Sequence, residues 1–164
     1  MPEHRPRILI VDDREQNRYV LCRLLERAGY ECEQAGTGRD ALERVQSLPD
    51  LVILDVNLPD VSGTDICQRI KQDPHTAHVA VLQVSAAFVS PTDKARALDA
   101  GADGYLTHPI DAVVLLPTVR SLLRLRKAEG LAREAAATWQ AVSGQVSQKQ
   151  GWRFLLPAIA TTVA

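Results

Sequence analysis

The stretch from Leu51 to Gly63 constrains the fold of this chain more than any other. Five apolar residues between Leu51 and Val56, interrupted only by Asp55, are typical of a strand buried on both faces of a parallel sheet. Asp55 then lies near the carboxyl end of that strand, where open α/β sheets gather their ligands and reactive groups. Burying a carboxylate is costly unless it is paired, metal-bound or used, so Asp55 is a candidate functional residue. A solvated strand-end carboxylate is the alternative.

The rest of the chain alternates short apolar runs with amphipathic segments. Strands are expected at residues 7–11, 30–35, 51–55, 79–84 and 104–107. Helices are expected at residues 14–28, 39–48, 64–72 and 91–100, and a last long helix follows Asp111 as its N-terminal cap. Five strands that alternate with five helices predict an α/β fold with a doubly wound five-stranded parallel sheet. This is the flavodoxin-like class, with strand order 2-1-3-4-5 and here an extended C-terminal helix.

Length and composition bound the remaining classes. The 164 residues allow one ordinary domain and an additional element. A net charge of −1 provides no general electrostatic footprint for nucleic acid or an anionic membrane. Cys22, Cys32 and Cys67 have no metal-like spacing, which favours reduced thiols. No apolar run approaches the about 20 residues of a membrane helix, and residues 1–7 lack a signal-peptide core. We expect a cytoplasmic protein with no direct nucleic-acid or membrane partner.

Polar residues follow the expected strands at the edge where parallel strands end. Asp12 and Asp13 follow the first strand, and Asp55 ends the third. Ser85 follows the fourth strand and His108 the fifth. Three carboxylates in one crevice raise one another's pKa, and a divalent cation relieves their repulsion, with oxygen ligands suiting Mg²⁺. A carboxylate beside Mg²⁺ can attack a phosphoryl group to give an aspartyl phosphate, and a hydroxyl such as that of Ser85 can stabilise the transferred group.

Several motifs together resemble one family. They are ILIVDD at residues 8–13, LDVNLP at 54–59, SG at 62–63, VSA at 84–86, GADGYL at 101–106, and Pro109. Residues 7 to about 127, roughly three quarters of the chain, closely resemble the receiver domain of two-component response regulators. The combination of motifs is far more specific than any one of them.

The resemblance implies a chemical role for the acidic residues. Asp55 would accept a phosphoryl group from a histidine kinase or phosphotransfer protein. Asp12, Asp13 and Asp55 would bind Mg²⁺, Asp13 more directly than Asp12, with the backbone carbonyl of Asn57 as a further ligand. The chain would then be a phosphoacceptor with Mg²⁺-dependent self-phosphorylation and dephosphorylation chemistry, and not an enzyme in its own right.

The resemblance also implies a switch, with one departure from the family's pattern. Ser85 would turn toward the phosphoryl oxygens, Tyr105 would change rotamer with it, and the fourth helix, fifth strand and fifth helix would carry the output. His108 stands where the family has lysine. Histidine is shorter than lysine and only partly charged at neutral pH, so we expect phosphorylation with an altered lifetime or weaker switching.

Beyond the receiver-like part, the apolar pattern continues. We expect a tail at residues 1–6, a receiver at 7–127, an amphipathic linker helix at 128–143 and a flexible tail at 144–164, with a loop at 145–150. Apolar residues recur at steps of three or four toward Val142, which could make the protein a parallel dimer. Pro117 predicts either a kink in the last helix or a regular start nearer Pro117.

Three alternatives compete with a phosphorylated receiver. A degenerate receiver would bind partners or dimerise without phosphorylation, because His108 replaces lysine. A small hydrolase would need an acid or base near Asp55, and the residue two positions on is Asn57. A nucleotide or flavin module is disfavoured, because the loop after the first strand is not glycine-rich. Taken alone, Asp12 and Asp13 could simply cap the first helix.

Overall fold

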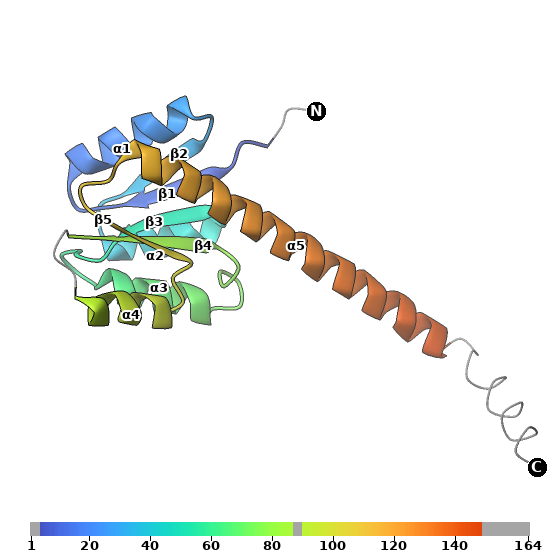
Figure 1. Cartoon of the computed structure of the whole chain (residues 1–164). Helices are drawn as coiled ribbons and strands as arrows, with labels where there is room; N and C mark the ends of the chain where they lie inside the picture. Colours follow the sequence, from blue (N-terminus) through green and yellow to red (C-terminus); the bar gives the residue numbers. More distant parts are fainter. Residues whose placement is uncertain (1–3, 87–89, 149–164) are drawn as a thin grey trace, which may run out of the picture. The chain divides into compact units, whose positions relative to one another are not determined.

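The computed structural model describes residues 4–86 and 90–148, in which five parallel strands form one sheet covered by helices on both faces (Figure 1). The strands are β1 (Arg7–Val11), β2 (Glu31–Ala35), β3 (Leu51–Asp55), β4 (Ala80–Ser85) and β5 (Gly104–Thr107). The helices are α1 (Glu15–Arg27), α2 (Gly38–Arg44), the 3₁₀-helix η1 (Val45–Ser47), α3 (Gly63–Gln72), α4 (Pro91–Asp99) and α5 (Ala112–Gln148). The sheet order β2-β1-β3-β4-β5 confirms the predicted fold class and topology.

Alternate strand residues contribute to two apolar cores. Ile8 and Ile10 of β1 belong to the core that α1 and α5 cover, whereas Leu9 and Val11 belong to the core under α2 and α3. The other central strands, β3 and β4, divide in the same way, so that both faces of these strands are buried. This explains why β1, β3 and β4 appear as continuous apolar runs instead of an alternating pattern.

The register of the sheet aligns the residues that follow the apolar runs. Val11 of β1 pairs with Leu54, and Asp55 pairs with Val84 of β4. Asp12 therefore emerges beside Asp55 at the carboxyl edge. While Leu54 is completely buried, Asp55 is only half-buried. The strand thus ends with a carboxylate at the boundary between the apolar core and the crevice.

The segment expected to be one helix at residues 39–48 is shorter in the structure. α2 ends at Arg44, and η1 follows it. Leu48 then adopts a left-handed conformation with φ 57°, which ends the helical run before Pro49. Pro49 explains why the helical run stops before Leu48, because its ring disfavours the right-handed α conformation for the residue before it.

The start of α5 agrees with the predicted cap. The Oδ1 atom of Asp111 accepts a hydrogen bond of 2.9 Å from the backbone N–H of Val113. Pro117 lies inside the helix, so the regular helix does not begin near Pro117. Because proline has no N–H, the carbonyl of Val113 receives no intrahelical hydrogen bond from it.

The chain divides into two units, Met1–Arg126 and Lys127–Ala164, and α5 continues into the second. The loop expected from Gln145 is wrong as far as Gln148, where α5 ends. Gly144 is the one residue near this point with poor helix propensity, and a glycine costs a helix only about 1 kcal/mol. The rest of the expected tail, residues 149–164, lies outside the described residues. Among the helices that the structure describes, none is both long and apolar enough to cross a membrane.

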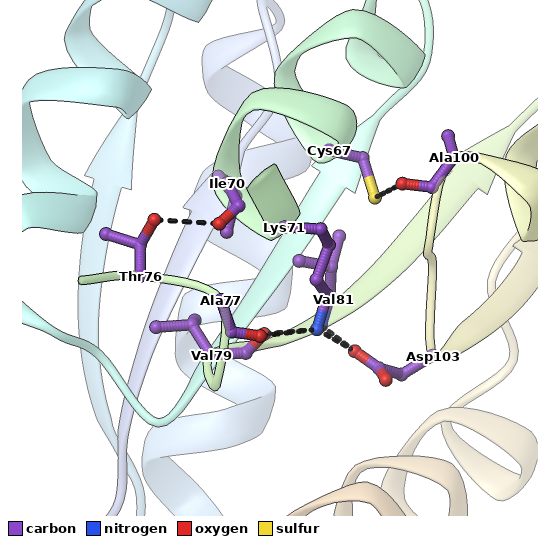
Figure 2. A network of polar contacts seen from close by, with 9 residues as sticks. All are labelled: Cys67, Ile70, Lys71, Thr76, Ala77, Val79, Val81, Ala100 and Asp103. Carbon is purple, nitrogen blue, oxygen red and sulfur yellow. Dashed lines mark hydrogen bonds and ion pairs between the residues drawn. The ribbon is translucent and has the colours of Figure 1, made fainter. Parts of the chain in front are cut away.

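A polar network lies at the amino ends of β4 and β5, on the side of the sheet away from the carboxyl ends of the strands (Figure 2). The ammonium of Lys71 in α3 donates to the carbonyl of Val79 at 2.7 Å and pairs with Asp103 Oδ2 at 2.7 Å. The same Asp103 oxygen accepts the backbone N–H of Val81 at 2.8 Å. One lysine therefore joins α3 to the segments that enter β4 and β5.

Candidate functional site

The ends of β1, β3 and β5 bring three possible metal ligands together. One ligand atom from each of Asp12, Asp55 and His108 lies within 4.8 Å of the other two. Asp12 is buried, with 3% of its surface exposed, whereas Asp55 and His108 are half-buried. A cavity of about 510 Å³ opens beside them, and its lining includes Asp55, His108, Asp13 and Asn57. The predicted convergence of strand ends is therefore present for these residues.

Asp12 is held in place by the first turn and a half of α1. Its Oδ1 accepts the backbone N–H of Arg14 at 2.8 Å, and its Oδ2 accepts the side-chain amide of Asn17 at 3.0 Å. The guanidinium of Arg18 donates to the Asp12 carbonyl at 2.8 Å. Each carboxylate oxygen keeps a second lone pair for another partner. The capping alternative is not borne out, because the N-cap of α1 is Arg14 and no side chain caps the helix; Asp12 binds only the N–H of Arg14 itself.

Sequence reasoning missed Asn17, which binds the Asp12 carboxylate, and Arg18, which binds the Asp12 backbone carbonyl. Asn17 also lines the cavity beside Asp55. The available signal was their position in the first turns of a helix that begins directly after Asp12 and Asp13. Such residues face back toward the end of the preceding strand in a βα unit.

The Asp55 carboxylate faces the cavity with one oxygen held. Its Oδ1 accepts the backbone N–H of Asn57 at 3.0 Å. Burial raises the pKa of the Asp55 carboxyl, and the carboxylates of Asp12 and Asp13 add to this rise. The Asn57 hydrogen bond and the His108 ring oppose it. The site thus contains a partly desolvated carboxylate with one free oxygen, a suitable arrangement for a nucleophile or a metal ligand.

Asp13 and Asn57 line the same cavity, and both are exposed. The three-membered ligand group contains Asp12, and Asp13 is not a member of it. The resemblance implied a more direct metal role for Asp13 than for Asp12. In this structure Asp12 belongs to the group with Asp55 and His108, and Asp13 lines the cavity beside them. The donors fit a divalent cation nonetheless, because Mg²⁺ takes one or two carboxylates and keeps several waters.

Ser85 and Tyr105 lie together at a second cavity, also of about 510 Å³. Asn57 and Ala86 line both cavities, so the two are neighbours. Ser85 is buried, and its carbonyl accepts the backbone N–H of His108 at 2.7 Å. The structure therefore brings Ser85 and Tyr105 together and connects them to Asp55 through shared lining residues.

Comparison with known proteins identifies the family. The response regulator receiver domain matches residues 8–120. The chain belongs to the response regulator receiver family. This match confirms the resemblance drawn from the sequence motifs. Receiver domains of this family work in two-component systems and interact with histidine kinases or phosphotransfer proteins.

Relatives of this receiver have varied architectures. It is 43% identical over 120 residues to the DNA-binding dual master transcriptional regulator RpaA of Synechocystis sp., covering 73% of this chain and 49% of RpaA. It is 32% identical over 117 residues to the polar-differentiation response regulator DivK of Brucella ovis, covering 71% of this chain and 94% of DivK. The receiver thus spans about half of RpaA and nearly all of DivK.

A solved structure supports the same assignment. The signal receiver domain of a putative Luxo repressor protein from Vibrio parahaemolyticus superposes with a TM-score of 0.72 at 32% identity. This superposition covers 78% of the present chain and 97% of that domain. The match lies in the receiver fold, which is the unit that contains Asp12, Asp55 and His108.

Proposed function

We propose that this receiver takes a phosphoryl group from a histidine kinase or phosphotransfer protein onto Asp55, in the cytoplasm, and signals through protein contacts. The observation that carries the proposal is the half-buried Asp55 carboxylate, whose ligand atom lies within 4.8 Å of those of Asp12 and His108 at the mouth of a cavity. The protein acts as a phosphoacceptor in this proposal, and not as a stand-alone enzyme.

The reaction needs a nucleophile that is fixed and still reactive. The Asn57 N–H holds Oδ1 of Asp55, which leaves Oδ2 to attack the phosphorus. The new bond joins Asp55 Oδ2 to phosphorus, and the bond from phosphorus to the donor's imidazole nitrogen breaks with its electron pair left on that nitrogen. The donor ring carries a proton on its other nitrogen, so it leaves as a neutral histidine. Partial burial favours this attack, because a desolvated carboxylate is less stabilised by water.

Mg²⁺ is the cofactor of this proposal. Asp12, Asp13, Asp55 and the backbone carbonyl of Asn57 would hold it, all four being residues at the carboxyl edge of the sheet. When bound, it would neutralise charge on the transferred group. Asn17 contributes by holding Asp12 in its orientation.

The switch is proposed to run from the Ser85 hydroxyl to Tyr105. Both residues line the second cavity together with Asp93 and Arg96 of α4. A phosphoryl group on Asp55 would attract the Ser85 hydroxyl, and the space this leaves would admit the Tyr105 ring. The output surface would then be α4, β5 and the first turns of α5.

A second copy of the chain is a proposed partner for the α5 extension. In this unit Leu131, Trp139 and Val142 are large apolar side chains with at least half of their surface exposed. Pairing of two such helices would cover them. Sedimentation of the wild type and of Trp139→Glu tests this: a dimer that the variant loses supports pairing, and a monomeric wild type contradicts it.

The experiment for the phosphoacceptor is intact mass after incubation with Mg²⁺ and a small donor, acetyl phosphate or phosphoramidate. We expect one added phosphoryl group on the wild type. Asp55→Asn is the matched control, since it keeps the shape of the side chain and removes the nucleophile. We expect no addition on this variant, nor on the wild type when a chelator removes Mg²⁺.

The same experiment distinguishes a phosphorylated receiver from a degenerate one. Absence of phosphorylation with every donor would contradict the proposal and leave a phosphorylation-independent interaction module as the better account. Addition to Asp55→Asn as well would place the modification elsewhere in the chain.

A further inference from the structure

His108 changes the donor chemistry of the acidic cluster. Two carboxylates alone are hard oxygen donors suited to Mg²⁺, whereas an imidazole suits Zn²⁺ and other first-row transition ions. Ligand atoms of Asp12, Asp55 and His108 all lie within 4.8 Å of one another. An imidazole and two carboxylates are three ligands of a type that Zn²⁺ binds at about 2.0–2.2 Å, with a fourth position open for water.

We propose that Asp12, Asp55 and His108 form a binding site for a divalent first-row transition ion, Zn²⁺ by its donor set, which competes with Mg²⁺ at the phosphoacceptor. The inference deepens the proposed function because it concerns the regulation of the same site, and its consequence for phosphorylation rests on that function.

The surroundings prepare His108 to act as a ligand. Its backbone N–H is fixed to the Ser85 carbonyl at 2.7 Å, which places the residue over the carboxyl edge of the sheet. Within the described part of the chain, the half-buried ring has no hydrogen-bond partner, so a ring nitrogen is free for a metal. Asp12 is held by Arg14 and Asn17, and this kind of outer support orients metal ligands.

The other potential zinc ligands of the chain are less suited. Residues 4–86 and 90–148 contain one group of three or more His, Cys, Asp or Glu ligands within reach of a single ion, and it is this one. The free thiols are poor competitors, since burial raises the pKa of Cys32 to about 12 and that of Cys67 to about 11. Burial also raises the pKa of Cys22, and a raised pKa disfavours the thiolate, which is the form that binds a metal.

Zinc at this position would oppose phosphoryl transfer. The Asp55 carboxylate would donate more electron density to Zn²⁺ than to Mg²⁺, which keeps much of its hydration shell, and would lose more of its nucleophilicity. The His108 ring, engaged with the ion, would no longer be free to face the incoming phosphoryl group. Phosphorylation would then depend on the ratio of Mg²⁺ to the transition ion.

Calorimetric titration of the full chain with Zn²⁺ tests the binding, in the presence of a phosphine reductant, which has no thiol to compete for zinc, and excess Mg²⁺. His108→Lys is the matched variant, because it restores the side chain that the family has and keeps every carboxylate. We expect one Zn²⁺ per wild-type chain and an affinity at least about tenfold weaker in His108→Lys, the usual effect of changing a residue at a metal site. Circular dichroism of both proteins verifies that the variant is folded.

A second readout uses Co²⁺, whose visible absorption reports its coordination. We expect a spectrum on the wild type that Zn²⁺ displaces and that is lost in His108→Lys. Equal Zn²⁺ affinity in the two proteins, or no binding to the wild type, would overturn the proposed site.

A separate experiment tests whether Zn²⁺ slows phosphorylation. Zn²⁺ should slow phosphorylation of the wild type by acetyl phosphate and Mg²⁺ at least about tenfold more than it slows that of His108→Lys. If Zn²⁺ slows the phosphorylation of the wild type and of His108→Lys equally, the proposed competition between Zn²⁺ and Mg²⁺ through His108 is wrong. Because zinc binding is measured without any phosphoryl donor, its failure is distinct from failure of Asp55 to be phosphorylated.

Discussion

Gly63 packs directly against the backbone of Asp55, and a β-carbon built at Gly63 would collide with the Asp55 carbonyl oxygen and lie 2.7 Å from the Cα of Val56. The backbone N–H of Gly63 also donates to the carbonyl of Val56 at 2.9 Å. The start of α3 is thereby pressed onto the end of β3. The position of the phosphoacceptor candidate depends on the absence of a side chain in the next helix.

Gly63→Ala should therefore destabilise the receiver and disturb the site. Because the atoms it meets are backbone, they cannot rotate away, and overpacking of this kind costs about 1–3 kcal/mol. Urea unfolding measures the loss. Gly130→Ala is the control, since nothing lies within 4 Å of a β-carbon there and alanine favours a helix. If Gly63→Ala leaves the free energy of unfolding unchanged, α3 can move away from β3 freely.

Ionised Asp55 should reduce the stability of the metal-free protein. Burial raises the pKa of this carboxyl above its ordinary 3.8, so the native state holds the proton more tightly than the unfolded chain. Asp55→Asn should then have a higher Tm than the wild type at neutral pH in the presence of a chelator. The gain should shrink as the pH falls through the raised pKa and vanish below about 3.8. A gain that persists at low pH would contradict this origin.

Asp60 should behave in the opposite way. The backbone N–H groups of Gly38 and Arg39 donate to its carboxylate at 2.8 and 2.9 Å and lower its pKa. Its stabilisation is therefore present above pH 3.8 and is lost as the pH falls through the lowered pKa. Asp60→Asn should lower Tm at neutral pH and approach the wild type in acid. Thermal melts across the pH range check both carboxylates, and identical pH profiles for the two variants would refute the opposite signs.

The sheet and its order were predictable from the sequence because they depend on local pattern. The apolar runs of β1 and β3 predict buried strands, and helices between strands impose parallel pairing. Most of the expected helix and strand boundaries lie within one residue of the observed boundaries. The exceptions are the ends of α2 and α5. The end of the helical run after α2 depends on the left-handed conformation of Leu48 before Pro49, which periodicity does not report, and α5 continues to Gln148, past the expected end at residue 143.

The site was predictable where a residue ends a strand, as Asp55 does, or directly follows one, as Asp12 and His108 do. It was not predictable where a contact depends on how a helix rotates over the sheet, as for Asn17 and Arg18. Gln83 is a similar case. It is a completely buried amide in β4 that donates to the carbonyl of Gly63 at 3.4 Å, and an apolar run conceals it.

Asn17 should limit the charge density of the site. Its amide donates to Asp12, so Asn17→Asp replaces a donor by a like charge beside a buried carboxylate. The variant should have a lower Tm than the wild type in chelator, and Mg²⁺ should raise its Tm by more than that of the wild type, because an ion that binds only the native state stabilises it. Gln16→Glu, on the exposed side of α1, is the control. Equal Mg²⁺ shifts in all three proteins would contradict the role of Asn17.

The network around Lys71 should stabilise the edge of the sheet remote from the site. Lys71→Met leaves the Val79 carbonyl and Asp103 without their shared cation and should cost about 1–3 kcal/mol in urea unfolding. A double-mutant cycle with Asp103→Asn should give a clear coupling energy. Arg39→Met removes an exposed pair with Glu43 at 3.7 Å and should cost about 0–0.5 kcal/mol. Equal costs for Lys71→Met and Arg39→Met would mean that the network adds no more than a surface ion pair.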